Sequence, residues 1–153
     1  MKNREILIGI VEAMSLTNEQ VQECLTFGNN PISDDELNLI LSDNESECLL
    51  EILEAFLNGI ITFKRGPKEE TSSKKKKIAP LSRKGINNVV MKKLKIALNL
   101  TNDDLVDVFS LVPYHISRGD LTTFFRKEGH KHYKKVDDHL LSRFFIGIEK
   151  TLN

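Results

Sequence analysis

One pattern of residues occurs twice in this chain and constrains its fold more than any other feature. Leu16-Thr17-Asn18-Glu19 returns as Leu100-Thr101-Asn102-Asp103. Further matches keep the same order: Ile32-Ser33 with Ile116-Ser117, Leu37 with Leu121, and 56–60 (Phe-Leu-Asn-Gly-Ile) with 144–148 (Phe-Phe-Ile-Gly-Ile), after an insertion near 129–132. A repeat this long indicates a duplicated small domain rather than a solenoid.

Periodic apolar residues predict four helices in each copy. In the first copy we expect helices over about residues 4–14, 17–28, 33–41 and 46–63. The fourth has a wide apolar stripe, which a core-facing helix requires. The sequence therefore predicts an all-α protein with two similar helical lobes of about four helices each, loosely helix-turn-helix-like. We expect the last helices of the two copies, rich in Phe and Ile, to form the contact between the lobes.

Helix caps support this assignment independently of the apolar pattern. In a capping box, a Ser or Thr hydroxyl accepts from the amide three residues on, and that residue's side chain bonds back to the cap amide. The matching pairs are Thr17 with Gln20, Ser33 with Glu36, Thr101 with Asp104, and Ser117 with Asp120. Caps at matching places in two divergent copies are rarely produced by chance.

Charge is segregated along the chain, although the net charge is zero. Residues 1–63 carry two basic and twelve acidic residues, and residues 64–95 carry twelve basic and two acidic residues. Such an asymmetry can steer charged partners. We predict a first helical repeat over 1–65, which is acidic, a basic flexible linker over 66–84, and a second helical repeat over 85–153.

Composition narrows the class of protein. Hydrophobic residues make up 40% of the chain, which supports a folded core. No apolar run is long enough to cross a membrane, and the charged N-terminus is not a secretion signal. Cys24 and Cys48 match no metal spacing, so we expect reduced core thiols of a cytoplasmic protein. Duplication often replaces a homodimer, so we favour a monomer and leave a dimer open.

The second copy opens with residues that resemble a known family. The stretch from Asn87 to Thr101, NNVVMKKLKIALNLT, resembles the opening of the YehS-like bacterial proteins. Residues 117–121, 125–127 and 144–148 are also similar to that family, in the same order. The resemblance covers nearly the whole chain. It implies a soluble bacterial protein from a duplicated-domain family of uncharacterised function, and it carries over no catalytic or binding residue.

Basic residues gather in the linker and in the second copy. They are Lys74, Lys75, Lys76 and Lys77 in the linker, and Arg118, Arg126, Lys127, Lys131, Lys134 and Lys135 on or after the third helix of the second copy. Tyr114 and Tyr133 are available to stack or bond. The first copy is unsuited to phosphate, because its third helix begins Asp34-Asp35-Glu36. Our leading hypothesis is a non-enzymatic binding protein that contacts nucleic acid through the second repeat and the Lys-rich linker.

Other interpretations of the same residues, without nucleic-acid binding, stay open. The linker lysines could serve only solubility, and the helix pairs could reflect generic packing. The acidic first repeat and the helical faces also suit a protein-protein interaction adaptor with a helical or basic partner. A pull-down from nuclease-treated lysate would separate the adaptor from the nucleic-acid binder.

Motifs for metal binding and catalysis are weak. His130-Lys131-His132 and Asp137-Asp138-His139 contain suitable ligands, but their spacing matches no structural zinc pattern and the lysines oppose a cation. We therefore predict no metal and no cofactor. The chain has no Gly-x-Ser-x-Gly and no phosphate-binding glycine loop, so we predict that it is not an enzyme.

Overall fold

Eight helices occur in the part of this chain that the structure describes. The structure is a computed structural model that describes residues 1–66, 81–113 and 116–152. The helices are α1 (Asn3–Ala13), α2 (Asn18–Phe27), α3 (Asp34–Ser42), α4 (Leu50–Arg65), α5 (Ile86–Ala97), α6 (Asn102–Ser110), α7 (Arg118–Phe124) and α8 (Asp138–Leu152). No strand occurs within these ranges, so the all-α prediction is confirmed. Nor does any helix in them have the length and apolar character that crossing a bilayer requires.

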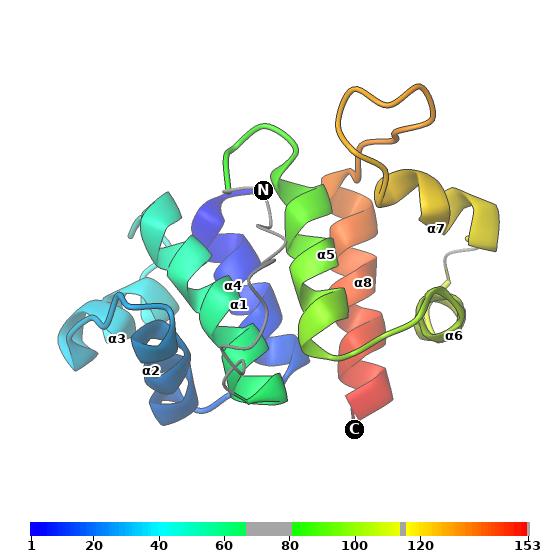
Figure 1. Ribbon diagram of the computed structural model, residues 1–153. Helices are drawn as coiled ribbons and strands as arrows, with labels where there is room; N and C mark the ends of the chain where they lie inside the picture. Colours follow the sequence, from blue (N-terminus) through cyan, green and yellow to red (C-terminus); the bar gives the residue numbers. More distant parts are fainter. Residues whose placement is uncertain (67–80, 114–115, 153) are drawn as a thin grey trace.

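Four helices form the centre of the molecule, and two pairs flank them. Figure 1 shows α1, α4, α5 and α8 in the middle, with α2 and α3 on one side and α6 and α7 on the other. We call α1–α4 the first half and α5–α8 the second half. The main contacts between the two halves join α4 to α5 and α1 to α8. The prediction that α4 and α8 form this interface was therefore wrong. Gly9 contributes to this arrangement, because a Cβ on it would lie 2.5 Å from the Phe145 ring of α8, so a larger residue at this position would require the ring to move.

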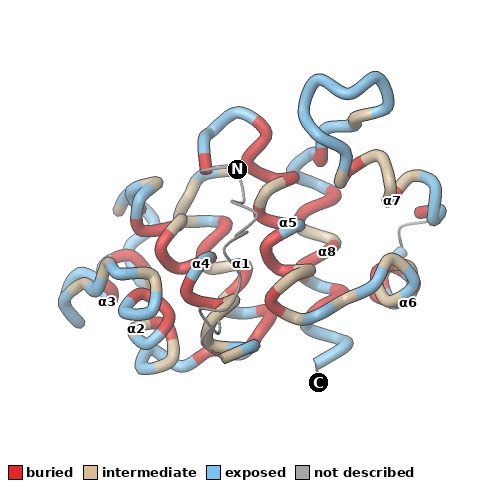
Figure 2. Tube along the Cα trace, in the orientation of Figure 1, coloured by how far each residue is buried: buried red, intermediate tan, exposed pale blue. Residues whose placement is uncertain are grey.

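The core is continuous across both halves. In Figure 2 the buried residues line the inner faces of the central helices. Phe56, Phe109 and Phe144 are fully buried. Cys24 and Cys48 are buried free thiols, as expected from the sequence. Burial raises the pKa of Cys24 to about 12 and that of Cys48 to about 11, so both stay protonated at neutral pH.

The predicted caps form, with one difference. Thr17, Thr101 and Ser117 each make both bonds of a capping box. Ser33 accepts from the Glu36 amide, which is the first of the two bonds. These contacts lie within four residues of chain, so sequence alone is sufficient to predict them.

The fourth helix begins later than predicted. It starts at Leu50 rather than near Ser46. The Ser46 hydroxyl donates to the carbonyl oxygens of Leu39 at 2.9 Å and of Asp43 at 2.8 Å, which holds a turn after α3. Cys48 then offers its carbonyl to Asn3 of α1. Contacts with α1 and α3 thus override the local helical pattern.

Helices α2 and α4 cross with their backbones in close contact. A Cβ on Gly59 of α4 would lie 1.6 Å from the Cys24 carbonyl oxygen of α2. A Cβ on Gly28, just after α2, would lie 2.0 Å from the Ala55 carbonyl oxygen of α4. Real Cβ atoms do not approach so closely, so both positions require glycine. This crossing fixes where α2 sits on the central helices.

One lysine is buried between the two halves. Lys93 of α5 is only 3% exposed, and its ammonium group donates to the Asn58 side-chain oxygen of α4. Burial lowers the pKa of Lys93 from its usual value, and the charge of Glu54 partly opposes this shift. A buried charge with one amide partner is a weak contributor to stability. The bond joins α5 to α4.

Candidate functional site

A groove in the second half brings basic and aromatic side chains together. It lies between the start of α5, the end of α7 and the loop that leads to α8, and it encloses about 490 Å³. Its lining residues are Gly85, Asn88, Val89, Lys92, Phe124, Phe125, Arg126, Lys127, Glu128 and Tyr133. We call it the basic groove. Its volume lies within the range of pockets that hold small molecules.

Asn88 builds one wall of the basic groove by tying the α7–α8 loop to α5. Its side-chain nitrogen donates to the carbonyl oxygens of Phe124 at 3.0 Å and Lys134 at 2.8 Å. Its side-chain oxygen accepts from the Val136 amide at 2.8 Å. Asn88 is buried, so these bonds are shielded from water and hold the loop in one conformation.

The lining of the basic groove is positively charged. Lys92, Arg126 and Lys127 are exposed cations. Among the described residues that line the groove, Glu128 is the one carboxylate, and it pairs with Lys84 at 3.2 Å. Three cations against one already paired carboxylate give a site that attracts anions, and Arg and Lys bind phosphate groups in this way.

Two half-buried aromatic side chains complete the basic groove. The ammonium of Lys95 lies 4.6 Å from the centre of the Phe125 ring and donates to the Asn102 side-chain oxygen at 2.9 Å. Burial raises the pKa of Tyr133, and so does the nearby charge of Glu128. Tyr133 is therefore a neutral phenol at physiological pH. Cations beside aromatic faces are the combination that binds nucleic-acid strands.

Helix α5 starts beside the groove without a side-chain cap. Its N-cap is Gly85, whose φ of 66° is left-handed, and the first turn of α5 contains no acidic residue. Helices α2, α6 and α7, in contrast, begin with capping boxes. The amides at a helix start carry partial positive charge. The start of α5 therefore adds to the positive potential of the basic groove.

The structure gathers some of the predicted basic residues and separates others. Arg126 and Lys127 line the basic groove, and Lys131, Lys134 and Lys135 are exposed on the loop that follows. Arg118 begins α7 and forms an ion pair with Asp103 of α6, away from the groove lining. Lys74, Lys75, Lys76, Lys77 and Tyr114 lie outside the described residues.

Sequence reasoning missed two important groups. Lys92 and Asn88 belong to α5, far along the chain from Arg126, and only tertiary packing brings them to the same groove. Phe125 was not identified as a groove residue from the sequence; it packs against the core and also lines the groove. The adjacent pair Asn87-Asn88 on an otherwise apolar helix could have indicated that α5 contacts a loop, because buried side-chain amides need hydrogen-bond partners.

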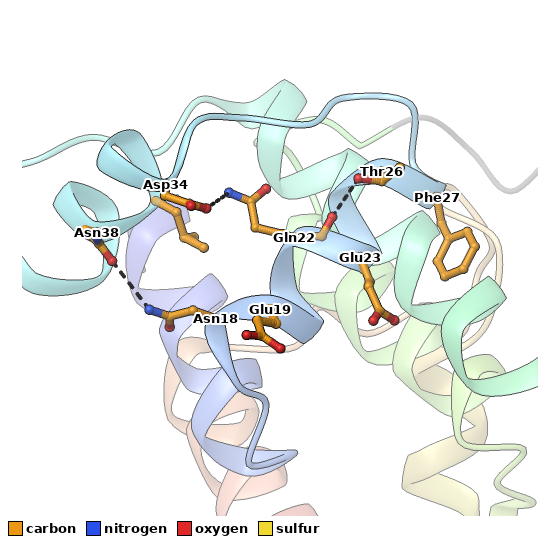
Figure 3. Close-up of a pocket in the computed structure, with 9 residues that line it drawn as sticks. Asn18, Glu19, Gln22, Glu23, Thr26, Phe27, Asp34 and Asn38 are labelled. Carbon is orange, nitrogen blue, oxygen red and sulfur yellow. Dashed lines mark hydrogen bonds between the residues drawn. The ribbon is translucent and has the colours of Figure 1, made fainter.

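A second groove lies in the first half, between α2 and α3. It encloses about 630 Å³, and its lining residues are Asn18, Glu19, Gln22, Glu23, Thr26, Phe27, Asp34, Leu37 and Asn38. We call it the acidic groove. Gln22 donates to Asp34 at 3.3 Å, and Figure 3 shows the two side chains pointing toward each other. Phe27 is 48% exposed at one end.

The histidines and aspartates of segment 130–139, which the sequence analysis considered as metal ligands and set aside, bond to other groups in the structure. The rings of His130 and His132 lie 5.8 Å apart, and the His132 amide donates to Nδ1 of His130 at 3.0 Å. Asp138 accepts from Asn87 at 2.8 Å. In the part of the chain that the structure describes, no group of three or more His, Cys, Asp or Glu could hold an ion.

Comparisons with known proteins agree with the sequence resemblance. A family model described as "Protein of unknown function (DUF1456)" matches residues 87–151, which include α6, α7 and nearly all of α5 and α8. The uncharacterized protein YehS of Escherichia coli (strain K12) is 28% identical over 152 residues, covering 97% of this chain and 94% of that protein. The resemblance to the YehS-like family is confirmed. No solved structure matches the chain.

Proposed function

We propose that this YehS-like protein is a non-enzymatic nucleic-acid-binding protein whose second half supplies the contact surface. The observation that carries the proposal is the basic groove, in which Lys92, Arg126 and Lys127 lie beside Phe125 and Tyr133. Cations contact phosphates, and aromatic faces stack on bases. The exposed lysines of the α7–α8 loop extend the same positive surface.

Contacts with phosphates make the affinity for nucleic acid depend strongly on the salt concentration. Each phosphate contact releases a condensed counterion, so affinity falls as salt rises. Three contacts from the groove cations predict a loss of about 20- to 40-fold between roughly 50 and 200 mM salt. Stacking of bases on the aromatic residues would be much less sensitive to salt, so the slope reports the phosphate contacts separately.

Reversing the groove charges tests the proposal. The variant Lys92→Glu/Arg126→Glu/Lys127→Glu is expected to bind at least about 50-fold more weakly at low salt, because three attractive contacts become repulsive. Fluorescence anisotropy with labelled single-stranded DNA, duplex DNA and RNA would measure the affinities.

A control variant with the same change in net charge separates the groove from general electrostatics. Lys2→Glu/Lys64→Glu/Lys150→Glu changes three exposed lysines that do not line the basic groove. We expect this variant to lose only a few-fold in affinity. Equal losses in both variants would assign the binding to net charge instead of the groove. Failure of the wild-type protein to bind any probe at low salt would end the proposal.

A protein-protein interaction adaptor is our second candidate function. The acidic groove favours it, because Glu19, Glu23 and Asp34 lie around an opening with an exposed Phe27 at one end (Figure 3). This combination of charge and apolar surface suits a basic amphipathic segment of a partner.

The adaptor is tested by a comparison of two baits. Wild-type protein and Glu19→Lys/Glu23→Lys would each be incubated with nuclease-treated bacterial lysate. We expect partners that the wild-type protein retains and the variant loses, because the variant repels basic segments. Retention of the same proteins by both baits would exclude the acidic groove as the binding surface.

We also propose that the two halves arose by duplication of one helical unit. Matched hydrogen bonds support this. Side chains in the first turns of α1 and α5 donate to carbonyl oxygens at equivalent positions. The Asn3 side chain donates to Cys48 at 3.0 Å, as that of Asn87 does to Val136 at 3.1 Å. The Arg4 side chain donates to Ile40 at 2.7 Å, as that of Asn88 does to Phe124 at 3.0 Å. Ser15 and Asn99, which follow α1 and α5, both have positive φ.

We propose a monomer in the cytoplasm as the working form of the protein. The two buried free thiols, Cys24 and Cys48, suit a reducing compartment. A protein with two pseudo-equivalent halves already has the internal contact that a homodimer would provide. Gel filtration with light scattering would measure the mass in solution.

A further inference from the structure

We propose that the basic groove takes one unpaired nucleotide of a single strand. Its base would lie against Phe125 and Tyr133, and its phosphate would lie at the start of α5, where Glu128 lies in this structure. The inference rests on the proposed function and names its substrate class. Three features support it, and they concern the aromatic side chains, helix α7 and Glu128.

The aromatic side chains favour an unpaired base. Phe125 is held in place by Lys95 on one face, and Lys95 is itself fixed by Asn102. Lys95 does not line the groove, whereas Phe125 and Tyr133 do. In a duplex the bases stack on each other and offer only their edges, so an aromatic ring inside a groove can stack only on a base that has left the duplex.

Helix α7 is poorly suited to read duplex DNA. It is the third helix of its half and would be the recognition helix of a helix-turn-helix, but it has only 7 residues. Its first residue, Arg118, is already paired with Asp103, and Asp120 adds a negative charge in the first turn. Phosphates would therefore meet a nearly neutral helix here, whereas the cations gather at the groove.

Glu128 marks where a phosphate would lie. Its Oε2 atom is 3.7 Å from the position that a Cβ on Gly85 would take, at the uncapped start of α5. Its other carboxylate oxygen pairs with Lys84 at 3.2 Å. A helix start and a lysine together are the partners that a phosphate group binds. A nucleotide phosphate can replace this carboxylate and gain Lys92 and Lys127 as further partners.

The base contact is tested with three labelled probes: a short oligothymidylate, an abasic oligonucleotide of equal length, and a duplex with the same number of phosphates. We expect the oligothymidylate to bind about 10-fold more tightly than the abasic strand, which is the scale of one to two stacked bases. Phe125→Leu/Tyr133→Leu should remove this difference, because leucine is apolar but has no aromatic face for a base to stack on. Phe27→Leu, outside the basic groove, should leave it unchanged.

The phosphate position is tested with Glu128→Gln. This variant is expected to bind oligothymidylate about 3-fold more tightly, which is the scale of one exposed charge interaction. Glu12→Gln on α1 makes the same change in net charge away from the groove and should not alter the affinity. Unchanged affinity in Glu128→Gln would overturn the assigned phosphate position. Thermal melting of each variant would verify that it is folded.

The results separate this inference from the proposed function. Equal affinity for oligothymidylate and the abasic strand, or tighter binding of the duplex, would overturn the unpaired nucleotide. If the triple charge reversal still abolished binding, the nucleic-acid function would stand without it. If no probe bound at low salt, both would fail.

Discussion

Gly59→Ala is expected to lower the free energy of unfolding by about 3 kcal/mol, because one added methyl group meets backbone rather than a side chain that can rotate away. The Cβ would lie 1.6 Å from the Cys24 carbonyl oxygen, and the next nearest atoms also belong to the backbone of Cys24. Helix α2 would have to move away from α4 to make room. Urea unfolding followed by circular dichroism would measure the loss.

Two further glycines provide controls for this prediction. Among the described residues, only the Ser117 hydroxyl lies near a Cβ on Gly119 of α7, at 3.7 Å, so Gly119→Ala should be neutral or stabilise by up to about 1 kcal/mol. Gly147 in α8 faces Val108 at 2.7 Å, partly through a side chain, so Gly147→Ala should fall between the other two. If Gly59→Ala were as stable as the wild-type protein, α2 and α4 could not be crossing as closely as described.

The helix starts were predictable because their cause is local. Thr17, Thr101 and Ser117 meet their capping partners three residues along the chain, and no other part of the molecule is needed. The start of α4 was not predictable, because the Ser46 hydroxyl bonds carbonyl oxygens near the end of α3 instead of capping a helix. A hydroxyl has several available partners, and the tertiary structure selects among them.

The pairing of the central helices was also beyond the sequence pattern. An apolar stripe states which face of a helix is buried, but not which helix covers it. The stripes of α4 and α8 were equally suited to each other and to α1 and α5. Shape decided the outcome, because the Phe145 ring of α8 fits against Gly9 of α1. A small residue opposite a large one is visible only once the register of both helices is known.

The candidate site could be predicted only in part, because the sequence reveals which residues are charged but not which of them lie close together in space. Arg126 and Lys127 were identified by their charge, and they lie in the basic groove. Arg118 was identified by the same criterion, yet it is paired with Asp103 from the preceding helix. Counting charges along a chain does not reveal which are already neutralised. Nor does such counting show that Lys92 and Arg126 line the same groove, because only the packing of α5 near the end of α7 brings them together.

Asn88→Ala is expected to lower the free energy of unfolding by about 3 kcal/mol and also to weaken nucleic-acid binding. The substitution leaves two carbonyl oxygens, of Phe124 and Lys134, and the Val136 amide without their present partner. Each buried backbone group that loses its partner costs about 1 kcal/mol or more. The loop that follows α7 carries Lys131 and Lys134, so its loosening also raises the entropy lost when a strand binds.

A matched control and two separate readouts make this prediction decisive. Asn38→Ala removes an exposed bond of 3.4 Å to Asn18, and we expect it to cost less than about 0.5 kcal/mol. Binding is measured at a temperature where both variants remain folded, so a loss of affinity in Asn88→Ala reports the loop and not the unfolded fraction. A loss of stability with unchanged affinity would mean that the loop does not contribute to binding. A change in stability near that of the control would mean that other contacts hold the loop on α5.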